Sequence, residues 1–248
     1  MSDSITAMKQ LIENGIKLDM ILCDLPYGTT ACAWDSILPM DELWTLYKRL
    51  IKPNGAIVLT ASQPFTSALV MANADGLKHH WVWDKGNGTG FQVAKYRPMM
   101  QTEDILVFTS KGETVNYYPQ KPKRKTKLSV RGGIRQSGSS PLQKDKVQTR
   151  EYDDSYPTNL LYYERESLGL HPTQKPVELF KYLVKTYSNE NDLVMDNTMG
   201  SGTTGVACMD LNRRFIGIEK GQEYFTIAEK RISAVANQIK LFERGKNY

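Results

Sequence analysis

The sequence predicts an α/β fold in which a mostly parallel β-sheet is covered by helices on both faces. Apolar runs typical of strands alternate with stretches of helical periodicity, which is the pattern of βαβ units. Two of these runs lead into loops that hold reactive or ligand-binding residue types, Asp24–Tyr27 and residues 196–205. In an open sheet of this class, ligands bind at the carboxyl ends of the strands.

Apolar spacing and breaker residues define the elements of the N-terminal half. The cluster at 52–55 (Lys-Pro-Asn-Gly) closes one helix, and Ser62 is a plausible N-cap for the next. The predicted elements are a helix at 4–15, a strand at 18–23, a helix at 42–51, a strand at 56–60, a helix after Pro64, and strands at 81–83 and 105–108 on either side of a glycine-rich loop at 86–90.

Regular patterning stops between residues 111 and 165 and resumes after His171–Pro176. The middle stretch is polar and basic with little periodicity, so we expect an insertion that is partly disordered. Residues 1–110 and 166–248 should form the core. The remaining predicted elements are a helix at 177–187, a strand at 193–195, a helix at 205–211, a strand at 215–218 and a helix at 224–241.

Charge is concentrated in one segment. The chain has 248 residues and a net charge of +5, yet residues 121–150 alone hold ten Lys or Arg residues and one acid, a net charge of +9. The remainder therefore carries −4. Such a distribution indicates a polyanionic partner that contacts this segment.

Composition excludes several other classes of protein. A hydrophobic content of 40% and a charged content of 24% are ordinary for a globular protein, and no apolar run approaches the roughly 20 residues that cross a bilayer. The N-terminus lacks the basic and apolar parts of a signal peptide. The three cysteines and three histidines show no metal or disulfide spacing. We expect a cytoplasmic protein with no metal and no membrane partner.

A carboxylate, a kinked backbone and an aromatic ring meet where the first predicted strand ends. Asp24 and the carbonyl of Leu25 or Pro26 can accept the hydrogens of an amino group, and Tyr27 can stack on the flat ring that bears it. An aromatic amine is a poor nucleophile because its lone pair is delocalised, so positioning and electrostatics would supply much of the acceleration. These four residues are the predicted catalytic set for modifying an exocyclic amine. On their own they could also be an ordinary exit from a strand.

The stretch Gly200–Gly205 fits G-x-G-x-x-G between a predicted strand and helix. Its glycines let a ligand approach the backbone, and the helix N-terminus offers N–H groups to an anion. Glu219 ends the next strand and could accept hydrogen bonds from ribose hydroxyls. A nucleoside-type cofactor is expected, with NAD(P) as the competitor. About 43 residues follow Gly205, too few for a dehydrogenase, so the cofactor half follows the Asp24 half as in a circular permutation.

Together these motifs resemble the amino-methylating DNA methyltransferases that use S-adenosylmethionine, in their β-type order. Asp24–Tyr27 is similar to the family's Asp-Pro-Pro-Tyr, with Leu in second place. Residues 196–203 resemble Asp-Pro-Phe-x-Gly-Ser-Gly-Thr, with Asn197 and Thr198 as departures, and His171–Pro176 matches His-Pro-Thr-Gln-Lys-Pro. The resemblance implies a Rossmann-like S-adenosylmethionine-dependent methyltransferase fold with circularly permuted motif order and a basic target-recognition insertion.

The resemblance also implies which residues bind the cofactor. Lys175, Thr173 and the amides of 201–203 would suit its carboxylate, and Glu219 its ribose. Asp3 takes the place of an acidic residue near the adenine. The full expected set is Asp3, Asp24, His171, Thr173, Gln174, Lys175, Asp196, Asn197, Thr198, Met199, Gly200, Ser201, Gly202, Thr203, Thr204 and Glu219.

Duplex DNA is the expected partner, with a homodimer and a cognate restriction endonuclease as further candidates. The target amine lies inside the base stack, so the base must be flipped out. The basic segment should neutralise phosphates or read base edges. The expected DNA-binding residues are Lys95, Arg97, Lys121, Lys123, Arg124, Lys125, Lys127, Arg131 and Arg135.

Adenine N6 is the favoured target, because Asp at position 24 is typical of the adenine enzymes. Cytosine N4 is the near alternative. Cytosine C5 is excluded, since that reaction needs a thiolate that follows a proline, and no cysteine here does. A degenerate fold that only binds DNA and an RNA or protein methyltransferase are the other readings.

Overall fold

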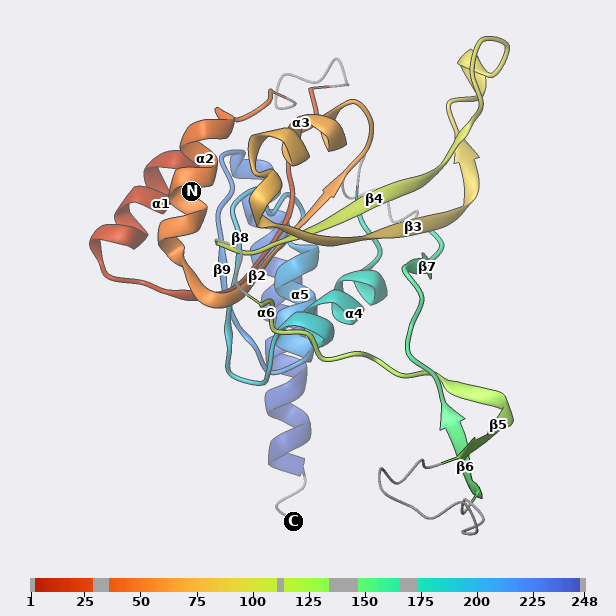
Figure 1. Cartoon of the computed structure of the whole chain (residues 1–248). Helices are drawn as coiled ribbons and strands as arrows, with labels where there is room; N and C mark the ends of the chain where they lie inside the picture. The colour runs from red at the N-terminus through yellow and green to blue at the C-terminus, as the bar shows by residue number, and fades with distance from the viewer. Residues whose placement is uncertain (1–2, 29–35, 111–113, 134–146, 166–173, 246–248) are drawn as a thin grey trace. The chain divides into compact units, whose positions relative to one another are not determined.

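The computed structural model describes the chain except residues 1–2, 29–35, 111–113, 134–146, 166–173 and 246–248 (Figure 1). The chain divides into two compact units. One comprises Met1–Tyr118 with Asn159–Tyr248, and the other comprises Pro119–Thr158.

The larger unit is built on a seven-stranded sheet with the order β7-β3-β4-β2-β1-β8-β9 (Figure 1). Only β4 runs against its neighbours, because it pairs antiparallel with both β2 and β3, whereas the other four neighbouring pairs are parallel. The strands are β1 (Leu18–Asp24), β2 (Ile51–Ala61), β3 (Leu77–Thr89), β4 (Met100–Phe108), β7 (Leu160–Tyr162), β8 (Leu193–Asp196) and β9 (Arg214–Gly217). The predicted fold class, a mostly parallel α/β sheet, is confirmed.

The pleat of β1 sends alternate side chains to two separate hydrophobic clusters. Ile21 and Cys23 belong to the cluster under α1 (Ser4–Glu13), α2 (Met40–Leu50) and α3 (Phe65–Ala72). Met20 and Leu22 belong to the cluster that includes side chains of α4 (Val177–Tyr187) and α5 (Thr203–Asp210). Helices therefore cover both faces, and β1 is buried between them. The last helix, α6 (Gln222–Gly245), contacts α5.

Most predicted elements are present, and three local predictions differ. β2 begins at Ile51, directly after α2, so the breaker cluster 52–55 lies within the strand. The N-cap of α3 is Pro64 and no side chain caps the helix, so Ser62 is not the cap that we predicted. β3 continues to Thr89, so most of the glycine-rich segment 86–90 that we predicted as a loop belongs to the strand.

The polar stretch 111–165 contains strands that the sequence analysis did not predict. β5 (Lys123–Gly133) and β6 (Val147–Asp154) form an antiparallel hairpin in the smaller unit. β7 lies in the same stretch of sequence but extends the main sheet by pairing with β3. Within the described residues, no helix is long and apolar enough to cross a membrane.

Candidate active site

Asp24 is the last residue of β1, where its carboxylate accepts hydrogen bonds from three side chains. Lys175 Nζ lies 2.8 Å from Oδ2, the Tyr27 hydroxyl lies 2.8 Å from Oδ1, and the Thr60 hydroxyl also donates to Oδ1. Thr60 reaches this position because β2 pairs with β1 in a register that sets it opposite Asp24. The carboxylate is therefore held in one orientation while about a quarter of its side chain stays exposed.

The Tyr27 ring is fixed at both its edge and its face. Its hydroxyl contacts Asp24 and Thr60, and its ring stacks on Phe65 with centroids 5.2 Å apart. Burial raises the pKa of the Tyr27 hydroxyl well above its usual value, and the nearby charges of Asp24 and Glu103 raise it further. The hydroxyl therefore stays protonated at neutral pH and donates a hydrogen bond to Asp24.

Lys175 links Asp24 to a second carboxylate that the sequence analysis missed. Its ammonium lies 3.3 Å from Glu103 Oε2, and Lys85 Nζ lies 3.2 Å from Glu103 Oε1. The two lysine side chains are only 7% and 4% exposed. Burial lowers the pKa of Lys175, but Asp24 and Glu103 outweigh it, and the pKa is raised. The result is an ion chain of alternating charge, Lys85–Glu103–Lys175–Asp24.

The glycine loop joins β8 to α5 beside Asp24. The Thr198 hydroxyl donates to the backbone carbonyl of Asp24 at 3.1 Å, which ties the two strand ends together. Gly200 and Gly202 both have positive φ, +50° and +82°, a conformation that favours glycine. A Cβ on Gly202 would lie 2.8 Å from Ala228 Cβ, so the glycine also permits α5 to pack closely on α6.

Glu219 lies after β9, and its carboxylate binds one backbone N–H of the glycine loop and one that lies two residues after Glu219 itself. Its carboxylate accepts hydrogen bonds from the N–H groups of Gly200 at 2.9 Å and Gly221 at 2.7 Å. Arg231 of α6 donates to the carbonyl and hydroxyl of Ser201, at 2.7 and 2.9 Å. Gln174 lies on the other side of Ser201, 3.4 Å from its hydroxyl.

Asp196 and Asn197 direct their side chains into the protein. Asp196 accepts hydrogen bonds from the Thr198 N–H at 3.0 Å and from the Thr204 hydroxyl. Burial raises its pKa to about 7, although the Thr204 and Thr198 hydrogen bonds oppose this shift. The Asn197 side chain lies in a buried polar cluster, whose other members are Ser4, Cys23 and Tyr47. Both side chains hold the loop in place through these hydrogen bonds.

The remaining predicted site residues fall into four groups. The carboxylate of Asp3 caps α1 through Thr6 at 3.2 Å. Lys95, Arg97 and Lys123 are exposed, and Lys121 lies 3.7 Å from Asp154. Leu25 is buried in the core, Pro26 is half-buried, and Met199 donates its N–H to the carbonyl of Ile218. The predictions that lie outside the described residues or side chains are His171, Thr173, Arg124, Lys125, Lys127, Arg131 and Arg135.

Comparison with known proteins decides the family. A family profile described as DNA methylase (N6_N4_Mtase) matches residues 18–230, which is most of the chain. The chain belongs to this family. This N6/N4 DNA methylase is 30% identical to the type II methyltransferase M.HpaI of Haemophilus parainfluenzae, over 95% of this chain and 74% of that one. It is 26% identical to the DNA adenine methyltransferase YhdJ of Escherichia coli K12, over 95% of this chain and 82% of the relative.

Solved structures agree with the sequence relatives. The complex of M1.HpyAVI with S-adenosylmethionine superimposes on this DNA methylase with a TM-score of 0.67 at 28% identity, covering 93% of this chain and 96% of the other. The cytosine-N4-specific PvuII methyltransferase shares the fold with a TM-score of 0.61, at 16% identity. The predicted methyltransferase family and fold are thus confirmed.

The residues at these strand ends fit S-adenosylmethionine, the cofactor of this DNA methylase. Gly200 takes the positive φ of a tight turn, so its backbone is open to close approach. The α5 N-terminus supplies N–H groups that suit a carboxylate. Each carboxylate oxygen of Glu219 accepts one hydrogen bond from the backbone, and each can accept a second. Acceptors for ribose and donors for a carboxylate are therefore adjacent.

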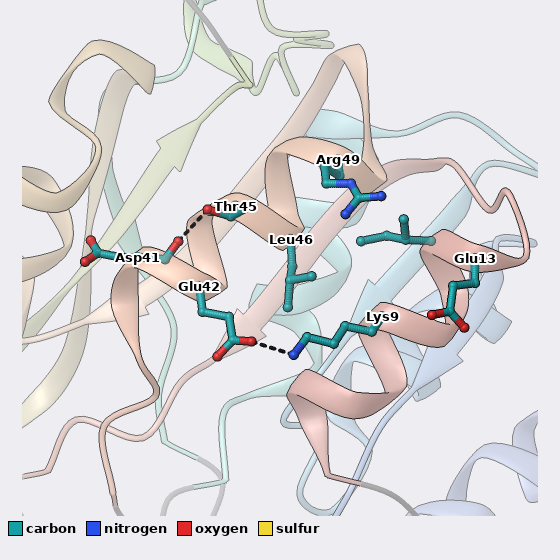
Figure 2. A pocket seen from close by; sticks show the side chains of 8 residues that line it. Lys9, Glu13, Asp41, Glu42, Thr45, Leu46 and Arg49 are labelled. Carbon is teal, nitrogen blue, oxygen red and sulfur yellow. Dashed lines mark hydrogen bonds and ion pairs between the residues drawn. The ribbon is translucent and has the colours of Figure 1, made fainter.

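A surface hollow elsewhere on the DNA methylase has no part in this site. It lies between α1 and α2, where Lys9 and Glu42 form an ion pair of 2.7 Å and the Thr45 hydroxyl donates to the Asp41 carbonyl (Figure 2). None of the predicted site residues lines it.

Proposed function

We propose that this protein transfers a methyl group from S-adenosylmethionine to N6 of adenine in duplex DNA. The observation that carries the proposal is the position of the Asp24 carboxylate. It is held by Lys175, Tyr27 and Thr60 at the end of β1, next to the β8–α5 glycine loop. Adenine as the target is supported by a DNA adenine methyltransferase among the relatives.

In the proposed mechanism the protein acts mainly by positioning. S-adenosylmethionine supplies the activated methyl group. Asp24 and the carbonyl of Leu25 or Pro26 accept the amino hydrogens, which localises the nitrogen lone pair. Tyr27 and Thr60 fix the orientation of the carboxylate through hydrogen bonds that exist before the base arrives. The flipped base would stack on the Tyr27 ring, which also packs against Phe65 and has the Lys175 ammonium 5.6 Å from its centroid.

The DNA would be bound by cations from two regions. Lys95 and Arg97 are exposed on the β3–β4 connection, and the basic segment 121–150 belongs largely to the smaller unit. We propose that this segment recognises the target sequence and that its Lys and Arg residues neutralise phosphates. We also propose a cognate restriction endonuclease as a functional partner, which the type II names of the relatives support, and the cytoplasm as the site of action. A homodimer is also proposed.

Replacing Asp24 with Asn tests the proposal. Asn keeps the shape of the side chain, but its NH₂ group is a donor that opposes the amino hydrogens. We expect methyl transfer to genomic DNA to fall at least about 100-fold, the scale of losing one preorganised electrostatic group. Labelled methyl transfer and nucleoside mass spectrometry measure the rate and identify the product.

Cofactor binding of the variant is measured by calorimetry, and the transfer rates are compared at saturating cofactor, because Asp24 also belongs to the expected cofactor-binding set. N6-methyladenine made by wild type and lost in D24N supports the proposal. If the product were N4-methylcytosine, the target would be cytosine N4 and not adenine N6. If D24N methylated DNA at the wild-type rate, the role of Asp24 would be refuted.

A further inference from the structure

Two aromatic side chains stand exposed at the turn that joins β3 to β4. We call residues 90–99 the hairpin tip. In this segment Phe91 is 79% exposed and Tyr96 is 87% exposed. Large apolar groups gathered in one exposed place indicate a binding surface, whereas scattered ones need no explanation.

The backbone of the hairpin tip is ordered by its own hydrogen bonds. Gly90, with φ of +90°, turns the chain into a short 3₁₀ helix at Phe91–Val93. Val93 N–H donates to the Gly90 carbonyl, and the N–H groups of Tyr96 and Arg97 both donate to the Val93 carbonyl. The two rings are therefore presented by a preformed turn, which lowers the entropic cost of binding.

The charge of the hairpin tip selects the kind of partner. Lys95 and Arg97 flank Tyr96 and are exposed, and the tip contains no acidic residue. Aromatic rings between cations are the chemistry that binds nucleic acid, because rings stack on bases while the cations contact phosphates.

The base of the same hairpin is joined to the proposed catalytic carboxylate. Glu103 of β4 pairs with Trp83 of β3 and is linked through Lys175 to Asp24. Along β4 the pairing continues to Met100, which is paired with Thr89 and lies three residues, or about 10 Å, beyond Glu103. β3 has six residues over the same stretch, with a register shift between Asp84 and Thr89. Figure 1 shows this two-stranded arm extending beyond the rest of the sheet. The tip thus extends from the site by a distance comparable to a few base-pair steps.

We propose that the hairpin tip enters the DNA beside the target adenine, where Phe91 and Tyr96 stack on the bases exposed when the adenine is flipped out. Lys95 and Arg97 hold the flanking phosphates. This role rests on the proposed methylation of duplex DNA and adds the group that stabilises the opened duplex. An inserted aromatic side chain offsets stacking energy that the extruded base gives up.

The test compares two DNA substrates built around the site that sequencing of the methylated DNA identifies. One is the matched duplex, and the other carries an abasic position opposite the target adenine, which removes its pairing partner. The F91A/Y96A double variant is measured against wild type and against M71A, which truncates a side chain that is 81% exposed on α3. We expect the double variant to lose on the order of 10- to 100-fold in kcat/KM on the matched duplex. On the abasic duplex the loss should shrink to a few-fold, and M71A should match wild type on both.

Each other outcome has a distinct meaning. An equal loss on both duplexes, or no loss on either, would overturn the inserted role. A change in oligomeric state on analytical ultracentrifugation, with no dependence on the substrate, would assign the hairpin tip to a contact between copies and also overturn it. If sequencing of DNA treated with wild type identified no methylated site, the proposed function itself would be overturned, and this result comes before any variant is measured, so it is distinct from failure of the tip.

Discussion

Asp24 and Lys175 illustrate how much a single residue's role depends on contacts that are distant in sequence. Sequence patterns identified both residues, and we expected Lys175 to bind the cofactor's carboxylate. In the structure its ammonium contacts Asp24 and Glu103. Glu103 and Lys85 could not be predicted, because β4 approaches the site by pairing with β2, and β3 by pairing with β4. The one local signal was the acidic pair Glu103 and Asp104 ahead of the predicted strand 105–108.

Asp196 is the residue whose titration should be visible in protein stability. Its folded pKa is raised to about 7 by burial, whereas the unfolded value is about 3.9. Between these values the unfolded chain is ionised and the folded chain holds the proton, so unfolding releases a proton and stability falls as pH rises. We expect a loss of a few kcal/mol from pH 4 to 7 that D196N, which is always neutral, does not share.

Urea denaturation of both proteins across pH 4 to 8 measures this effect. The quantity to follow is the difference in unfolding free energy between wild type and D196N, since other carboxylates affect both proteins alike. Asn can keep the hydrogen bond from the Thr198 N–H, so the variant should fold. A difference that stays constant with pH would show that Asp196 is ionised throughout.

At the level of elements, periodicity predicted the helices better than the strands. α4 has the predicted limits, because its apolar stripe is flanked by Pro176 and by the polar end at Ser188. β5 and β6 were missed, since β5 is dominated by Lys and Arg, β6 is polar with more acidic than basic residues, and neither alternates apolar with polar residues throughout. β7 was missed because three residues give no period, and only pairing with β3 defines it as a strand.

The packing of α5 on α6 should depend on Gly202. Alanine there would combine a strained φ of +82° with a Cβ that lies 2.8 Å from Ala228. We expect G202A to lose about 2–4 kcal/mol of unfolding free energy and to weaken cofactor binding, because the helices must separate at the glycine loop.

Gly15 provides the matched control. Its φ of +70° is similarly positive, but a Cβ there meets nothing within 4 Å. G15A should therefore show the backbone strain alone, about 1 kcal/mol, with unchanged cofactor affinity. Urea denaturation and calorimetry measure both quantities. Equal destabilisation by the two variants would mean that close helix packing is not the reason for glycine at 202.

For the whole molecule, the separation of charge predicts how DNA binding responds to salt. Residues 121–150 carry +9 while the rest carries −4, so most counterion release should come from this one segment. A variant with Gln at positions 121, 123, 124, 125 and 127 removes five cations. We expect the slope of log K against log salt to fall by up to about 4.5, since each phosphate contact contributes roughly 0.9.

Fluorescence anisotropy with labelled duplex DNA at several salt concentrations measures the slope. A control variant with Gln at exposed Lys9 and Lys48, which lie on α1 and α2, should leave it unchanged. If the five-residue variant kept the wild-type slope, these five residues would have no contact with phosphates.

The overall architecture was predictable because alternating elements and the order of motifs both constrain a sheet. The strand order itself was not, since it depends on crossovers that leave no local pattern. The edge position of β7 is the result of such a long connection, whereas β4 is antiparallel because a hairpin joins it to β3.

The central place of β1 also has a consequence in time. Asp24 and Cys23 make contacts with Thr198 and Asn197, which are 174 positions later in the chain. At a synthesis rate of roughly 5–20 residues per second, the edge of β1 that pairs with β8 stays unpaired for about 10 to 35 s during translation. Such an unpaired edge invites aggregation, so the nascent chain should depend on chaperones until β8 emerges. The protein therefore acquires its site only after β8 and the glycine loop that follows it have been synthesised.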